Sequence, residues 1–171
     1  IRMKKIIFAL PGNETLARQL AKRLRVPLGK LELRRFPDDE SYVRILSNVV
    51  GKEAVLVCTL HRPDEKMMAL YFLAKSLREM KAGKITLVAP YLAYMRQDKK
   101  FKKGESLTST HFARFLSSFI DKLVTIDPHL HRRHSLSGIY KIPAMALHAS
   151  DLIAAYIHKN IVNPVLIGPD I

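Results

Sequence analysis

Short apolar runs alternate along this chain with longer segments whose apolar residues recur at helical spacing, and this alternation narrows the possible folds most. The runs predict buried strands, and the segments between them predict amphipathic helices. Strands that alternate with helices form a mostly parallel sheet with helices on both faces. We therefore expect an α/β fold of this kind, with a small antiparallel element near residues 31–46.

The pattern places the elements as follows. The predicted strands are residues 5–10, 31–36, 42–46, 54–60, 85–89, 123–126, 142–147 and 164–167. The predicted helices are residues 14–25, 66–80, 108–119 and 150–160. Side-chain oxygens at helix starts can accept hydrogen bonds from free backbone N–H groups. The candidate N-caps are Asn13, Ser106 or Thr108, and Ser150 or Asp151.

A cationic loop, PYLAYMRQDKKFKKGES at residues 90–106, follows the predicted strand 85–89. Its five basic side chains are Arg96, Lys99, Lys100, Lys102 and Lys103. An arginine can hold phosphate with two parallel hydrogen bonds, whereas lysines act as point charges. The neighbouring Gln97 and Asp98 can bind neutral or hydroxyl groups. A solvated lysine loop is the ordinary alternative for such a run.

Polar clusters follow four of the predicted strands, at residues 61–64, 96–103, 127–131 and 170. In a parallel sheet these strand ends share one edge, where ligands bind. Asp127, His129 and Asp170 together offer ligands for a hard divalent metal such as Mg²⁺. In the alternative interpretation, Asp127 caps a turn and His129 is an ordinary loop residue.

The composition limits the function classes. The net charge of +14 predicts attraction to phosphates, on nucleotides, sugar phosphates or nucleic acid. No glycine-rich phosphate motif is present, so side chains would have to hold a nucleotide. The only cysteine, Cys58, excludes an internal disulfide, and a reduced cytoplasmic setting is expected. No apolar run has transmembrane length, so no membrane partner is expected.

Four motifs together resemble the ribose-phosphate diphosphokinases, the enzymes that make phosphoribosyl pyrophosphate. They are FPDDESYVRI at 36–45, PYLAYMRQDKKFKKGESLTS at 90–109, TIDPHLH at 125–131 and GPD at 168–170. The resemblance implies a phosphoribosyltransferase-like fold. It also implies Mg²⁺-dependent transfer of the diphosphoryl group of ATP to the 1-hydroxyl of ribose 5-phosphate, with release of AMP.

The resemblance also assigns roles to residues. It implies a homo-oligomer in which the turn around Asp39 contacts the adenosine part of ATP in a neighbouring subunit, through Phe36, Asp38 and Glu40. The family usually has glycine where this chain has Asp39. The residues implied to hold ATP and its phosphates are Arg96, Gln97, Asp98 and His129. The residues implied at the magnesium ion are Asp127, His129 and Asp170.

We expect residues 1–148 to form an ATP-binding domain and residues 149–171 to begin a second domain. The family's catalytic loops belong to that second domain, so no catalytic residue is assigned and this chain alone is expected to be inactive. One rival is a non-catalytic regulatory relative, which the retained Arg96, Gln97 and His129 argue against. Another is a basic nucleic-acid-binding protein, which is less favoured because no nucleic-acid module is recognised.

Overall fold

The computed structural model describes residues 3–168 and contains one five-stranded sheet in the order β1-β4-β5-β6-β7. All neighbouring strands in this sheet are parallel. Its strands are β1 (Lys5–Ala9), β4 (Glu53–Val57), β5 (Lys84–Ala89), β6 (Lys122–Ile126) and β7 (Ala144–Leu147). A second, antiparallel sheet pairs β2 (Leu31–Arg35) with β3 (Ser41–Ile45). The predicted α/β fold and its antiparallel element are therefore confirmed.

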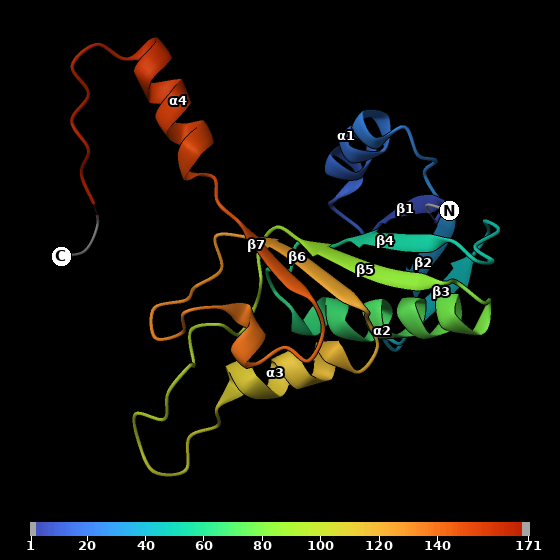
Figure 1. Ribbon diagram of the computed structural model, residues 1–171. Coiled ribbons are helices and arrows are strands. Elements are labelled where there is room, and N and C mark those ends of the chain that lie inside the picture. The colour runs from blue at the N-terminus through green and yellow to red at the C-terminus, as the bar shows by residue number, and fades with distance from the viewer. Residues whose placement is uncertain (1–2, 169–171) are drawn as a thin grey trace.

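Helices lie on both faces of the main sheet. Helix α1 (Glu14–Leu24) covers one face, and α2 (Asp64–Glu79) and α3 (Thr108–Ser117) cover the other (Figure 1). A short 3₁₀ helix, η1 (Leu136–Gly138), precedes β7. Helix α4 (Ser150–Asn160) follows β7 and projects away from the sheet (Figure 1).

The larger core lies between the sheet and helices α2 and α3. Helix α2 contributes the fully buried Leu70 and Leu73, and α3 contributes Leu116. A smaller cluster beneath α1 joins Ala17 and Ala21 to side chains of β1 and β4. All five residues of β4 are buried, which explains why its sequence is a nearly continuous apolar run.

The antiparallel ribbon of β2 and β3 packs its apolar side against the larger core. Leu31 and Leu33 of β2 face Ile45 and Val43 of β3 in register, and all four contact that core. Arg34, on the opposite side of β2, is exposed. The alternation of apolar and charged residues along each strand thus fixes which side of the ribbon faces the core.

The strand predicted at residues 164–167 is wrong. Residues 161–168 form no helix or strand and are exposed throughout. Val165, Leu166 and Ile167 have the composition of a strand, but a strand also needs a neighbour to pair with. Within the described part of the chain, no strand pairs with this segment.

The predicted side-chain caps are also wrong. Helices α3 and α4 follow Leu107 and Ala149, and neither helix start has a side-chain cap hydrogen bond. Asn13 does precede α1, but its side-chain amide donates to the carbonyls of Leu10 and Pro11. Its side-chain oxygen accepts from the backbone N–H of Thr59 at 2.9 Å, so Asn13 ties the β1–α1 turn to the end of β4.

Cys58 lies in the core immediately after β4, where burial raises its thiol pKa to about 11. The residue is therefore a small core side chain, as its apolar surroundings predicted. Among residues 3–168, no helix combines the length and hydrophobicity needed to cross a membrane.

Candidate functional site

Three of the four predicted polar clusters meet at one edge of the main sheet. The strands are parallel, so β4, β5 and β6 all end at this edge. The segment after β5 contacts the segment after β4, because the Leu60 N–H donates to the Tyr91 carbonyl at 3.0 Å and the Tyr94 hydroxyl donates to the Asp64 carboxylate. The fourth predicted residue, Asp170, lies outside the described residues.

The cationic loop is organised by a residue that sequence reasoning missed, Glu105. One of its carboxylate oxygens accepts hydrogen bonds from the backbone N–H groups of Phe101 (2.7 Å) and Lys102 (3.1 Å). The same oxygen accepts from the Gln97 side-chain amide at 3.1 Å. These bonds, led by those from Lys102 and Phe101, lower the pKa of Glu105 below its usual range. Glu105 thus fixes the loop tip and orients Gln97.

An ion pair joins the cationic loop to the loop after β6. Asp98 accepts a hydrogen bond from the guanidinium of Arg132 at 3.1 Å, and only 1% of the Asp98 side chain is exposed. Burial acts to raise the pKa of Asp98, but the hydrogen bond and charge of Arg132 outweigh it and lower that pKa overall. The Arg132 guanidinium also lies 5.2 Å from the centre of the Phe101 ring, a cation–π contact.

The next residue, Arg133, makes a second link between the same two loops. Its guanidinium donates to the hydroxyls of Ser109 (3.1 Å) and Thr110 (3.2 Å), in the first turn of α3. The backbone N–H of Ser109 in turn donates to the Gln97 carbonyl. Neither arginine has a role predicted from the sequence, because no local pattern shows which distant residues they contact.

Asp127 sits at the end of β6 with both carboxylate oxygens engaged. One oxygen is 3.0 Å from His148 Nδ1, and the other accepts from the Ala149 N–H at 3.1 Å. The Ala149 N–H and then His148 lower the pKa of Asp127. His129, two residues on, has its ring 6.0 Å from that of His131. Asp127 therefore holds the junction between β7 and α4 through partners more than 20 residues away, which neither the metal-ligand prediction nor the turn-capping alternative included.

The turn at residues 36–40 joins β2 to β3 and is exposed along its whole length. The Phe36 N–H donates to the Glu40 carbonyl at 2.8 Å, and an Asp38 carboxylate oxygen accepts from the Glu40 N–H at 3.3 Å. Asp39 has φ = 67°, in the left-handed region that favours glycine. The backbone thus keeps a glycine-type conformation although the residue is aspartate. None of the hydrogen bonds found in residues 3–168 joins this turn to Arg96 or His129.

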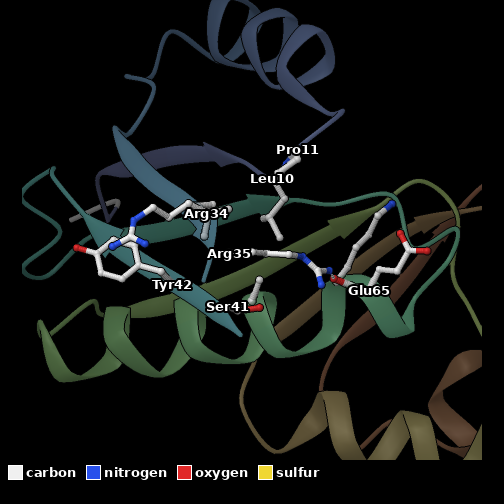
Figure 2. Close-up of a pocket in the computed structure, with 10 residues that line it drawn as sticks. Leu10, Pro11, Arg34, Arg35, Ser41, Tyr42 and Glu65 are labelled. Carbon is white, nitrogen blue, oxygen red and sulfur yellow. Dashed lines mark hydrogen bonds between the residues drawn. The ribbon is translucent and has the colours of Figure 1, made fainter. Parts of the chain in front are cut away.

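A pocket of about 250 Å³ lies between the ribbon, the end of β1 and the first turn of α2 (Figure 2). Arg35 crosses it and donates to the backbone carbonyl of Glu65 at 2.9 Å. Arg34 lies beside it with its guanidinium 4.0 Å from the centre of the Tyr42 ring. The residues lining the pocket are Leu10, Pro11, Leu33, Arg34, Arg35, Ser41, Tyr42, Glu65, Lys66 and Ala69. They include none of the residues predicted to bind ATP or metal.

Comparison with known proteins identifies the family. Residues 5–119 match the family model for the N-terminal domain of ribose phosphate pyrophosphokinase, which is well over half of the 171 residues. The chain belongs to the ribose-phosphate pyrophosphokinase family. This is another name for the diphosphokinases that the four sequence motifs resemble, so the predicted family is confirmed.

Individual ribose-phosphate pyrophosphokinases show the same likeness. The chain is 35% identical over 167 residues to the protein so named from Saccharolobus solfataricus, covering 96% of this chain and 56% of that one. It is 33% identical over 166 residues to the protein from Methanothermobacter thermautotrophicus, covering 96% and 57%. The chain thus spans a little over half the length of these relatives.

A solved structure from the same family has a similar fold. The crystal structure of phosphoribosylpyrophosphate synthetase from Mycobacterium smegmatis superposes with a TM-score of 0.84 at 27% sequence identity. The match covers 92% of this chain and 52% of that one. The parallel sheet that brings the polar loops to one edge is therefore shared with a member of the ribose-phosphate pyrophosphokinase family.

Proposed function

We propose that this chain is the Mg–ATP-binding part of a ribose-phosphate pyrophosphokinase. The observation that carries the proposal is the joining of two family motifs at the carboxyl edge of the sheet. The motif with Arg96 and Gln97 is tied to the loop that continues from the motif with His129, by the ion pair between Asp98 and Arg132. Ligands of parallel α/β sheets bind outside this edge.

The side chains of the cationic loop suit a triphosphate. Arg96 is exposed and carries a guanidinium able to hold two phosphate oxygens at once. Gln97, whose amide nitrogen is held by Glu105, would present a fixed polar group. The exposed Lys99 and Lys100 add positive charge without a fixed geometry. Together they would neutralise the phosphates and place them in line for transfer.

The turn between β2 and β3 is proposed to complete the ATP site of a neighbouring subunit. Phe36 stands edge-on to Tyr42, with ring centres 5.9 Å apart, and leaves 40% of its surface exposed. An exposed aromatic ring can stack on an adenine base, and Asp38 and Glu40 can accept hydrogen bonds from amine or hydroxyl groups. This arrangement requires a homo-oligomer, which is part of the proposal.

Magnesium is proposed to arrive as the Mg–ATP complex, with His129 and Asp170 beside the metal. Asp127 fits the role of direct ligand poorly, since both its oxygens accept hydrogen bonds within the protein. Among the residues that the structure describes, no group of three or more potential metal-binding side chains occurs. Asp127 would then act by fixing the chain that leads towards Asp170. When bound, the metal would neutralise the triphosphate.

In the proposed reaction, the 1-hydroxyl oxygen of ribose 5-phosphate forms a bond to the β-phosphorus of ATP. The bond from that phosphorus to the α–β bridging oxygen breaks, AMP leaves with the oxygen, and the hydroxyl proton is released. We propose that residues 149–171 begin a second domain, and that the ribose phosphate is bound there. The 171 residues alone should therefore bind Mg–ATP weakly and form no phosphoribosyl pyrophosphate.

Titration of Mg–ATP into the chain, followed by calorimetry or NMR, tests this proposal. Arg96→Ala should weaken binding about tenfold, because charge-assisted phosphate contacts are worth roughly 1.5–3 kcal/mol. Arg18→Ala, on the exposed side of α1, is the matched control and should bind like the wild type. Equal affinity of Arg96→Ala and wild type would remove Arg96 from the site. Formation of phosphoribosyl pyrophosphate by this chain alone would refute its expected inactivity.

A further inference from the structure

We propose that Arg132 and Arg133 are positioning residues that clamp the two loops of the candidate nucleotide site into one arrangement. In this proposal Asp98 serves the clamp and does not contact ATP. The inference rests on the proposed function, since it explains how that site is held in shape. It gives a role to two consecutive arginines that lie outside the four family motifs quoted above.

The Asp98 carboxylate is almost completely buried. With 1% of its side chain exposed, this carboxylate cannot reach a ligand in solvent. A carboxylate beside a triphosphate would also repel it, whereas here the Asp98 charge is matched by Arg132 at 3.1 Å. A buried charge with a specific partner fixes geometry, and removing that partner leaves a costly unpaired group.

Arg132 contacts two residues of the cationic loop. Besides Asp98 it contacts the ring of Phe101, at 5.2 Å from guanidinium carbon to ring centre. Phe101 is also tied through its backbone N–H to Glu105, the residue that holds the Gln97 amide. One guanidinium therefore braces both ends of the segment that begins at Asp98 and ends at Phe101. Arg96 and Gln97 immediately precede this segment.

Arg133 is the second residue of the clamp. It binds the hydroxyls of Ser109 and Thr110, where the cationic loop enters α3. The loop is thus held at its middle by Arg132 and just beyond its end, in the first turn of α3, by Arg133, both from the segment that carries His129. Because two adjacent arginines hold the loop, the loop cannot rotate about a single ion pair. This keeps the phosphate-binding side chains in a fixed relation to His129.

Affinity for Mg–ATP and amide exchange together test the clamp. Arg132→Ala should weaken Mg–ATP binding about five- to tenfold, because residues that share one hydrogen-bonded network are energetically coupled. It should also speed amide exchange at Phe101 and Lys102, whose N–H groups bond Glu105. Arg132→Lys, which keeps the charge, should recover part of the affinity. Asp98→Asn combined with Arg132→Ala should bind no more weakly than Arg132→Ala alone, because both act through one contact.

Parallel measurements on Arg96→Ala and on the Arg18→Ala control separate the two proposals. If Arg96→Ala is weakened but Arg132→Ala binds like the wild type, the clamp is wrong and the nucleotide site stands. If Arg132→Ala leaves amide exchange at Phe101 and Lys102 unchanged, the clamp is likewise wrong. If Arg96→Ala itself binds like the wild type, Arg96 is removed from the nucleotide site, and the amide exchange of Arg132→Ala still decides the clamp.

Discussion

Helices α3 and α4 are nearly equal in length, at 10 and 11 residues, but they are packed very differently. Helix α3 buries Phe112, Ala113 and Leu116 against the sheet. Helix α4 buries no residue at all, and its Leu152 side chain is 76% exposed. Both sequences contain enough apolar residues to form amphipathic helices. The comparison shows that apolar spacing predicts a helix, but not whether the described chain covers its apolar side.

The two helices also differ in what attaches them to the protein. Helix α3 is held by the large core and by the two hydroxyls that Arg133 binds. The junction before α4 is held by a single carboxylate, Asp127, which bonds His148 and Ala149. A helix anchored by buried area should resist changes that would release a helix anchored by one charge.

Replacing one leucine by alanine in each helix should give the largest difference between α3 and α4 in the free energy of unfolding. Leu116→Ala removes a fully buried side chain from α3 and should lower the free energy of unfolding by about 2–5 kcal/mol. Leu152→Ala, the matched change in α4, should alter it by less than about 0.5 kcal/mol. Urea denaturation measures both. Equal losses would show that α4 is packed as tightly as α3.

Acid should lower the free energy of unfolding of the protein, because it protonates Glu53. Its carboxylate accepts from Thr86 at 2.7 Å and pairs with Lys5, linking β4 to both neighbouring strands. Burial acts to raise its pKa, but these partners lower it overall. A carboxyl with a lowered folded pKa stabilises above its unfolded pKa and loses that contribution as pH falls through the folded value.

Replacing Glu53 with glutamine tests this contribution. At neutral pH, Glu53→Gln should cost about 1–3 kcal/mol, the usual range for losing a hydrogen-bonded charge. The difference from the wild type should shrink as pH falls below the ordinary carboxyl range. A difference that stays constant even well below that range would exclude the ionised form of Glu53 as its source.

The junction to α4 should respond to acid locally. The folded pKa of Asp127 is lowered, so its bonds to Ala149 and His148 hold at neutral pH and weaken as pH falls through that pKa. Asp127→Asn should loosen the junction already at neutral pH. NMR signals of Ala149 and His148 should shift in both cases, while those of Leu116 in α3 stay unchanged. Equal shifts in α3 would contradict the separation of the two helices.

Removing residues 149–171 should have the smallest effect on the free energy of unfolding. Because α4 buries no side chain, the shortened chain should keep its free energy of unfolding within about 0.5 kcal/mol. The denaturant midpoint and slope of both chains give this comparison directly. A loss of several kcal/mol would mean that α4 supports the sheet.

Most element types and the meeting of the polar loops followed from sequence pattern, because they depend on which residues stand within or directly after a strand. The apolar run at residues 54–60 predicted a buried strand, and the strands predicted within residues 31–46 gave the small antiparallel element. The position of polar residues after strands predicted which loops meet. These features repeat every few residues and are visible in one chain.

The contacts inside the site could not be predicted in this way. Asp98 and Arg132 are 34 residues apart, and nothing near either one indicates the other. The same holds for Asp127, whose partners are His148 and Ala149 and whose spacing from His129 suggested a metal pair instead. The strand predicted at residues 164–167 failed because pairing depends on a neighbour, which local composition does not show.

The parallel sheet also has a consequence for how the chain folds. The pairing of β1 with β4 joins residues such as Lys5 and Glu53, which are 48 positions apart, whereas β2 and β3 are joined by one short turn. Closing a long loop is entropically costly and slow, so the ribbon should form before the main sheet. During synthesis, β1 would meet residues 27–29 first, through the backbone bonds of Ile7 with Pro27 and Gly29, and would pair with β4 only after the hairpin between them has formed.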